Sequence, residues 1–165
     1  MIRLRDAVEA DLNSLFELDQ ICFPAGVAYS LGEFRSVLRS SRTIGVVAED
    51  EEVLAGFAMA QSGWFRRAHG SHVITIDVAP AFRRRGIGRL LMDHVEARVT
   101  DGGASWLRLE VAVDNSGALS FYTGLGFEPI GRIRGYYRGN LDAIVMEKAL
   151  AGRACDSTAR AEPLP

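Results

Sequence analysis

The chain has 165 residues and a formal net charge of −2, and 48% of its residues are hydrophobic and 24% charged. This length predicts one domain with its own core, and the small net charge disfavours a general nucleic-acid-binding protein. No apolar run approaches the roughly 18 residues of a membrane span, the N-terminus lacks an apolar signal core, and two cysteines do not make a disulfide framework. We therefore expect a cytoplasmic protein without nucleic acid or membrane as a partner.

The first half of the sequence predicts a strand, two helices and a hairpin. Apolar residues at Leu12, Leu15 and Phe16 have the spacing of one helical face. Ser30 followed by Glu33 is the pattern of a capping box, which starts a helix. The predicted elements of this half are strand 2–5, helix 6–23, a helix that begins after Ser30, and the paired strands 43–48 and 53–61.

The second half alternates strands and helices and then ends in a hairpin. Leu107, Leu109 and Val111 alternate with polar residues, as on a strand with one buried face. The predicted elements are a loop at 62–70, strand 72–78, helix 86–99, strand 106–113, helix 115–122, and strands 130–133 and 143–150 with a wide connection between them. This order predicts an α/β fold with a mixed sheet and helices on its faces, formed by residues 1–150, followed by a disordered tail at 151–165.

Residues 73–91 predict an anion-binding loop. An apolar strand leads into Pro80, the arginines Arg83 to Arg85, the pair Gly86 and Gly88, and an amphipathic run. Backbone N–H groups at the start of a helix point toward one place, the helix dipole favours negative charge there, and glycines let a phosphate approach closely. We interpret this loop as the site for the pyrophosphate of a coenzyme. A dinucleotide-binding motif is disfavoured because Leu91 stands where its third glycine would be.

The segment from Arg83 to Gly88 resembles the Gln/Arg-x-x-Gly-x-Gly/Ala acetyl-CoA signature of the GNAT superfamily of N-acetyltransferases. Residues 109–127 resemble the strand–helix block of the same superfamily, and the resemblance covers residues 2–150. It implies the GNAT fold, a mostly antiparallel sheet splayed at the cofactor site. It also implies acetyl-CoA as co-substrate and no metal, and none of the three histidines has a partner at metal-ligand spacing.

Within the superfamily the chain is most similar to protein N-terminal acetyltransferases, in particular the bacterial group that acetylates an alanine of a ribosomal protein. Glu110 with Tyr122, Phe23 with Pro24, and residues 134–146 carry this likeness. Segment 25–29 differs, since the bacterial enzymes tend to have a shorter segment with Trp after the proline. The expected acceptor is thus a protein N-terminus, with a polyamine, amino acid or antibiotic amine as the alternative, and a non-catalytic acyl-CoA-binding module as a third hypothesis. A monomer or a homodimer is expected.

The resemblance gives roles to two residues, and each has a plainer alternative. Glu110 is the expected base, or else a strand carboxylate paired with Arg108 or with a neighbouring strand. Tyr122 is the expected acid that protonates the leaving thiolate, or else an aromatic packing residue. Because Phe121 is the better core residue of the two aromatics, we expect Tyr122 to face the cofactor.

The remaining expectations concern binding. The same resemblance implies that the Val78 N–H stabilises the oxyanion, that strand 76–78 pairs with the pantetheine arm, and that Asn115 bonds that arm, although Asn115 could instead cap its helix. The predicted cofactor-binding residues are Ile76, Asp77, Val78, Arg84, Arg85, Gly86, Ile87, Gly88, Arg89, Asn115 and Tyr122. The predicted acceptor walls, which could instead be loop packing, are Phe23, Pro24, Tyr29, Tyr136 and Tyr137. Direct attack by the amine is favoured, and Cys22 stays open as an acyl carrier.

Overall fold

A seven-stranded sheet forms the centre of the computed structural model, which describes residues 1–24, 27–63, 69–137 and 139–150. The strands lie in the order β1-β2-β3-β4-β5-β7-β6, and all neighbours are antiparallel except β4 and β5. The strands are β1 Ile2–Asp6, β2 Thr43–Asp50, β3 Val53–Ser62, β4 Gly70–Val78, β5 Trp106–Ala112, β6 Glu128–Tyr137 and β7 Leu141–Ala149. The α-helices are α1 Leu12–Cys22, α2 Leu31–Arg39, α3 Ile87–Asp101 and α4 Ser116–Gly124, and the short 3-10 turns are η1 Glu9–Asp11 and η2 Pro80–Phe82. The predicted mixed sheet and the predicted order of elements are confirmed.

Two predicted details are wrong. The first helix begins at Leu12 rather than near residue 6, because the preceding residues belong to β1 and η1. The final hairpin has a short connection, since β6 continues to Tyr137 and β7 begins at Leu141. The register of β6 shifts between Ile133 and Tyr137. Because of this irregularity, the alternation of apolar and polar residues does not reveal the full length of the strand.

Some predictions cannot be compared with the structure. The predicted tail at 151–165, most of the predicted loop at 62–70 and the first two residues of segment 25–29 lie outside the described residues. The division into a domain of residues 1–150 and a disordered tail therefore stays a prediction. None of the helices within the described ranges has the length and hydropathy of a membrane span.

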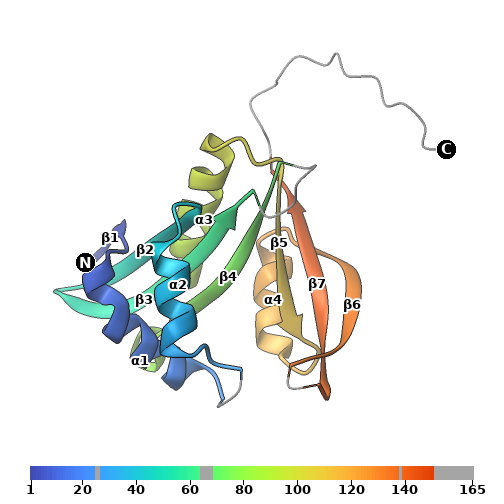
Figure 1. Cartoon of the computed structure of the whole chain (residues 1–165), viewed down its shortest axis with the longest axis horizontal. Coiled ribbons are helices and arrows are strands. Elements are labelled where there is room, and N and C mark those ends of the chain that lie inside the picture. Colours follow the sequence, from blue (N-terminus) through green and yellow to red (C-terminus); the bar gives the residue numbers. More distant parts are fainter. Residues whose placement is uncertain (25–26, 64–68, 138, 151–165) are drawn as a thin grey trace.

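The sheet separates into a wedge between β4 and β5. These two strands pair only over Gly70–His72 and Trp106–Arg108, whereas β5 pairs with β7 along its whole length. Figure 1 shows the two strands close together at one end and diverging toward the other. Gly70 makes the joint possible, because a Cβ at that position would lie 2.0 Å from the Trp106 ring. Beyond His72, the edge of β4 faces an open gap.

Two hydrophobic clusters cover the two faces of the sheet. Helices α1 and α2 bury Leu15 and Phe34 against Phe57 of β3, with Phe34 and Phe57 ring centroids 5.8 Å apart. Helices α3 and α4 contribute Leu91 and Tyr122 to the second cluster. The capping box predicted at Ser30 is confirmed, since its side chain accepts from the Glu33 N–H at 3.3 Å and its own N–H donates to the Glu33 carboxylate at 2.8 Å. The wedge between β4 and β5 therefore lies between the layer of α1 and α2 and the layer of α3 and α4.

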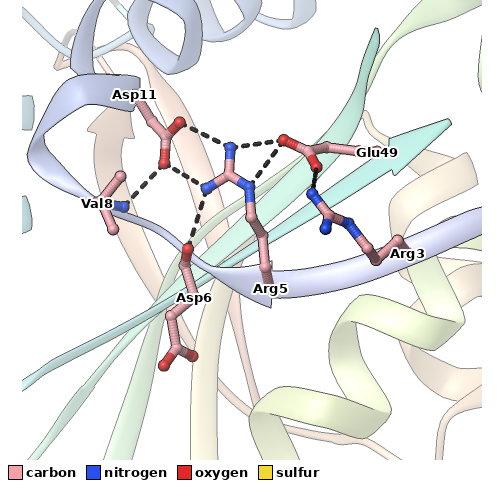
Figure 2. A network of polar contacts seen from close by, with 6 residues as sticks. All are labelled: Arg3, Arg5, Asp6, Val8, Asp11 and Glu49. Carbon is pink, nitrogen blue, oxygen red and sulfur yellow. Dashed lines mark hydrogen bonds and ion pairs between the residues drawn. The ribbon is translucent and has the colours of Figure 1, made fainter. Parts of the chain in front are cut away.

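A charged network fastens the N-terminal strand (Figure 2). The Arg5 guanidinium donates to both oxygens of Asp11, at 2.7 and 2.8 Å, and to Glu49 at 2.8 Å. Asp11 also accepts from the Val8 N–H at 2.8 Å, and Arg3 donates to Glu49 at 2.9 Å. Hydrogen bonds from Arg5 lower the pKa of both carboxyl groups. Arg5 thus joins β1 to η1 and β2 through charge-assisted bonds.

Replacing Arg5 with Ala is expected to lower the free energy of unfolding by about 1–2 kcal/mol at pH 7, because two carboxylates lose their shared donor. Urea denaturation measures the change. Arg3→Ala is the matched control and should cost less than about 0.5 kcal/mol, because its side chain is 71% exposed. Since the Asp11 and Glu49 pKa values are lowered by folding, the difference between wild type and Arg5→Ala is present above about pH 4 and shrinks as pH falls further. Equal effects of the two substitutions would contradict this account.

Candidate active site

A cleft of about 1390 Å³ lies in the wedge between β4 and β5. Its walls come from the end of α1 and the following loop, the β4–α3 connection, the beginning of α4, and β6. All predicted site residues except Arg85 line it, namely Phe23, Pro24, Tyr29, Ile76, Asp77, Val78, Arg84, Gly86, Ile87, Gly88, Arg89, Glu110, Asn115, Tyr122, Tyr136 and Tyr137. The Arg85 guanidinium instead lies 5.2 Å from the centre of the Phe82 ring. The structure therefore brings two distant blocks of the sequence to one cavity.

The loop at the start of α3 has the backbone of an anion site. Arg84 and Gly86 have positive φ values of 64° and 79°, and Gly86 is the N-cap of α3. Left-handed residues of this kind turn successive N–H groups toward one concavity, next to the positive end of the helix dipole. Gly88 has a different role, because a Cβ there would come within 3.1 Å of the Phe121 ring. The second glycine of the motif therefore lets α4 pack against α3.

The far half of β4 exposes backbone groups to the cleft. The Val78 carbonyl accepts from Arg83 Nε at 3.0 Å, while the Ala79 N–H donates to Ala55 of β3 at 2.9 Å. Because the N–H and C=O of one strand residue point to the same side, the Val78 N–H points away from β3 and toward the gap. The wedge thus leaves a strand edge with groups that an extended ligand could pair with.

Glu110 and His72 form a close pair across the wedge. His72 Nε2 lies 2.6 Å from Glu110 Oε2, and the two side chains are only 10% and 13% exposed. The Tyr137 hydroxyl donates to the Glu110 carbonyl at 3.3 Å, and the Tyr136 hydroxyl lies 3.5 Å from its carboxylate. Arg108, the alternative partner considered for Glu110, donates to Glu147 at 2.7 and 3.1 Å.

The sequence did not predict His72 as part of the site. The strand that carries it was predicted, but the pairing depends on the register in which β4 runs beside β5. In that register His72 lies opposite Arg108, so Glu110 comes two residues further along β5. A parallel neighbour separated by a helix in sequence cannot be aligned from periodicity alone.

The prediction for the aromatic pair on α4 was wrong about burial. Tyr122 is only 7% exposed and belongs to the core, with its ring centroid 5.7 Å from that of Phe127. Phe121 is the less buried residue of the two, and both line the cleft. Burial raises the pKa of Tyr122, and the charge of Asp77 raises it further, so the phenol stays protonated at neutral pH. Tyr122 can therefore act as a hydrogen-bond or proton donor within the cleft.

Asn115 has the structural role considered for it. Its side-chain oxygen accepts from the Ala118 N–H at 3.0 Å, which caps α4. Because Asn115 also lines the cleft, a contact with the pantetheine arm stays a prediction beside the confirmed cap.

Tyr29 is fixed at the opposite wall of the cleft by three hydrogen bonds. Its N–H donates to Asp19 at 2.9 Å, its carbonyl accepts from Gln20 at 2.9 Å, and its hydroxyl donates to the Ile74 carbonyl at 3.2 Å. Such fixation is what a binding wall requires. The acceptor role of Tyr29, like that of the other predicted wall residues, stays a prediction.

Cys22 lies in the cleft in a setting that disfavours a thiolate. Burial, together with the negative charge of Asp77, raises the pKa of its thiol to about 11. The thiolate is the nucleophilic form of cysteine, so Cys22 is a poor acyl carrier near neutral pH. Among the described residues, no three His, Cys, Asp or Glu side chains gather in a way that could hold a metal ion.

We therefore predict that acetyl-CoA alone leaves no acetyl group on the protein. Intact mass spectrometry after incubation without acceptor should show the unmodified mass, and Cys22→Ala should keep turnover within about threefold of wild type. An acetylated form that disappears in Cys22→Ala would contradict direct attack and establish a covalent route.

Comparison with known proteins gives matches over most of the chain. The model of the acetyltransferase (GNAT) family matches residues 12–127. The chain is 30% identical over 138 residues to the catalytic subunit naa20 of the N-terminal acetyltransferase B complex of Schizosaccharomyces pombe, covering 81% of this chain and 77% of that protein. It is 29% identical over 157 residues to an N-alpha-acetyltransferase of Sulfurisphaera tokodaii, covering 90% and 93%.

Solved structures are also similar over nearly the whole chain. The crystal structure of the ribosomal-protein-S18-alanine N-acetyltransferase from Escherichia coli superposes with a TM-score of 0.84 at 25% identity. The superposition covers 97% of this chain and 100% of that one.

Proposed function

We propose that this protein, which belongs to the acetyltransferase (GNAT) family, acetylates the N-terminal α-amino group of a protein, such as a ribosomal protein. As a member of that family it has the GNAT fold and is an N-acetyltransferase that uses acetyl-CoA. A non-catalytic acyl-CoA-binding module is therefore set aside. A cytoplasmic location and a monomeric or homodimeric state are part of the proposal.

The observation that carries the proposal is the Glu110–His72 pair beside the tyrosine-lined wall. Tyr29, Tyr136 and Tyr137 line the same cleft as the Glu110 carboxylate. The pair thus lies where a narrow peptide end would present its amine. Relatives that act on protein N-termini, in fission yeast, an archaeon and a bacterium, support the same acceptor class.

The chemistry of the acceptor fits a modest base. An α-amino group has a pKa of about 8, so about a tenth is neutral at pH 7, whereas a lysine with a pKa of about 10.4 is neutral in less than a thousandth. Selecting the neutral form costs about 3 kcal/mol more for lysine, at 1.36 kcal/mol per unit. We propose that Glu110, held by His72 at 2.6 Å, accepts the proton directly or through water.

The remaining steps use groups that point into the cleft. The amine nitrogen forms a bond to the thioester carbonyl carbon, and the Val78 N–H stabilises the developing oxyanion. As the carbon–sulfur bond breaks, the protonated Tyr122 hydroxyl donates to the leaving sulfur. The ammonium nitrogen loses two protons, one to Glu110 before it attacks and one to solvent water after the carbon–nitrogen bond has formed. Tyr122 gives its proton to sulfur and regains one from solvent, so the net reaction releases one proton.

The basic end of the cleft is proposed to hold the coenzyme. The N–H groups of the Arg84–Gly88 loop and the side chains of Arg84 and Arg89 would bind the pyrophosphate. The open edge of β4 at residues 76–78 would pair with the pantetheine amides.

The acceptor proposal predicts a clear order of activity. Short peptides with free N-termini should be acetylated with a kcat/KM at least about tenfold above that of polyamines, amino acids or aminoglycosides. Intact mass of each acceptor after incubation with acetyl-CoA gives the product, and N-terminally blocked peptides carrying an internal lysine are the control. Preferred turnover of a small amine would replace this proposal with the small-amine alternative.

Glu110→Gln should reduce kcat by about 10²-fold at pH 7, within the usual range for a lost general base. The deficit should shrink toward pH 9, because the acceptor amine loses its proton to solvent as pH passes its pKa of about 8. Steady-state kinetics and acetyl-CoA titration measure both effects, with acetyl-CoA affinity unchanged. Glu147→Gln is the matched control, since Glu147 is outside the described cleft lining. Near-normal turnover of Glu110→Gln would remove Glu110 from the base role.

A further inference from the structure

The side chains of β4 point alternately to the two sides of the reaction centre. The Val78 side chain faces α3, because a Cβ on Gly88 would lie 3.9 Å from Val78 Cγ2. The preceding residue, Asp77, points to the opposite face, where Thr75 Oγ1 donates to its Oδ2 at 2.8 Å. That face is covered by α1, which ends at the proposed acceptor wall. The cofactor role predicted for Asp77 is a backbone role and stays a prediction, while its side chain points toward the face covered by α1.

One oxygen of the buried Asp77 carboxylate is without a hydrogen-bond donor among the described residues. Asp77 is 1% exposed and lines the cleft, and its Oδ1 has no hydrogen-bond partner among the described residues. Arg83 is near, but its guanidinium donates to the Val78 carbonyl and to Cys22 Sγ, at 3.0 and 3.6 Å. A buried carboxylate oxygen without a donor is costly unless a ligand supplies one.

Charge is divided along the cleft. Arg84 and Arg89, among the described lining residues, come from the loop and helix start that would face the pyrophosphate, whereas the Arg83 guanidinium lies 3.6 Å from Cys22 Sγ at the end of α1. The carboxylates of Asp77 and Glu110 line the acceptor side, and Asp114 lines the cleft before α4. The acceptor side thus carries two lining carboxylates beside Arg83, which suits a ligand that arrives as an ammonium ion.

We propose that Asp77 is a specificity-determining residue whose carboxylate draws the acceptor's α-ammonium group into the cleft, next to Glu110 and the oxyanion position at Val78. The inference rests on the proposed function, since its ligand is the charged N-terminus of a peptide. The ammonium supplies a donor to Asp77 Oδ1, and Glu110 then takes the proton that must leave before nitrogen attacks.

The protonation behaviour of Asp77 agrees with this role. Burial raises its pKa to about 7, the charge of Asp19 adds to the rise, and Thr75, Cys22 and Arg83 oppose it. The charge of Asp77 also raises the pKa of Tyr122 on α4, which stays neutral. Asp77 is thus charged above about pH 7, where an α-amine with a pKa near 8 is still largely an ammonium ion.

The test compares an acceptor peptide with a desamino analogue, in which hydrogen replaces the α-ammonium group. Binding is measured by calorimetry at pH 7.5 on full-length protein saturated with CoA, which carries no acetyl group. Wild type should bind the amino peptide at least tenfold more tightly than the desamino peptide. In Asp77→Asn the preference should fall by at least tenfold, with the desamino peptide and CoA bound as in wild type. Asp114→Asn, which removes an exposed carboxylate from the same lining, should keep the wild-type preference.

An unchanged preference in Asp77→Asn would overturn the assignment. If that variant does not fold, the proposal is tested on wild type alone. Its preference for the amino peptide over the desamino peptide should decline as pH falls from 7.5 to 5.5, because Asp77 gains a proton. A constant preference over that range would equally overturn it. Should wild type acetylate small amines rather than peptides, the proposed function fails separately, and the same comparison is made with such an amine and its deaminated analogue.

Discussion

Hydrogen bonding between β4 and β5 stops after three residue pairs, and the rest of the site depends on that interruption. A continuous parallel pairing would satisfy the backbone groups of residues 73–78 within the sheet. Because the strands diverge, the groups of this stretch that point away from β3 face a cleft instead, where Arg83 meets the Val78 carbonyl and a ligand or water can meet others. The same divergence leaves the His72–Glu110 pair at the narrow end of the wedge and Val78 at its open end. The short pairing of β4 and β5 therefore creates both an unpaired strand edge and a cleft.

The two faces of β4 in the wedge also present their side chains to different partners. A strand presents successive side chains to opposite faces, so adjacent residues on β4 serve different partners. Val78 faces the helix that begins with the anion loop, whereas Asp77 faces the helix that leads to Tyr29. Arg84 and Arg89 lie at the anion loop and the start of α3, and Asp77 and Glu110 lie toward the acceptor wall, which suits an anionic coenzyme meeting a cationic amine.

Local signals in the sequence were sufficient for much of this arrangement. The anion loop at Arg84–Gly88, the capping box at Ser30 and the order of the elements depend on residues close together in the chain, and the structure confirms the cap and that order. What failed was non-local. His72 meets Glu110 only through the register of parallel strands, and the burial of Tyr122 follows from packing on Phe127. The direction of the Asp77 side chain could not be predicted for the same reason, since the alternation of residues along a strand does not say which helices cover which face of the sheet.

Gly70 and Trp106 meet at the paired end of the wedge, where a small change in the angle between the strands has its largest effect at the open end. The stretch from the paired end of β4 to Val78 is about six residues, or roughly 20 Å at the rise of a strand. A rotation of about 5° at the joint therefore displaces the far end by about 2 Å, enough to make or break a hydrogen bond. The Trp106 ring occupies the space that any side chain at position 70 would need, two residues before His72 and at the opposite end of β4 from Val78. A side chain at position 70 would therefore force a shift at the paired end, and that shift would be largest at the open end of the cleft.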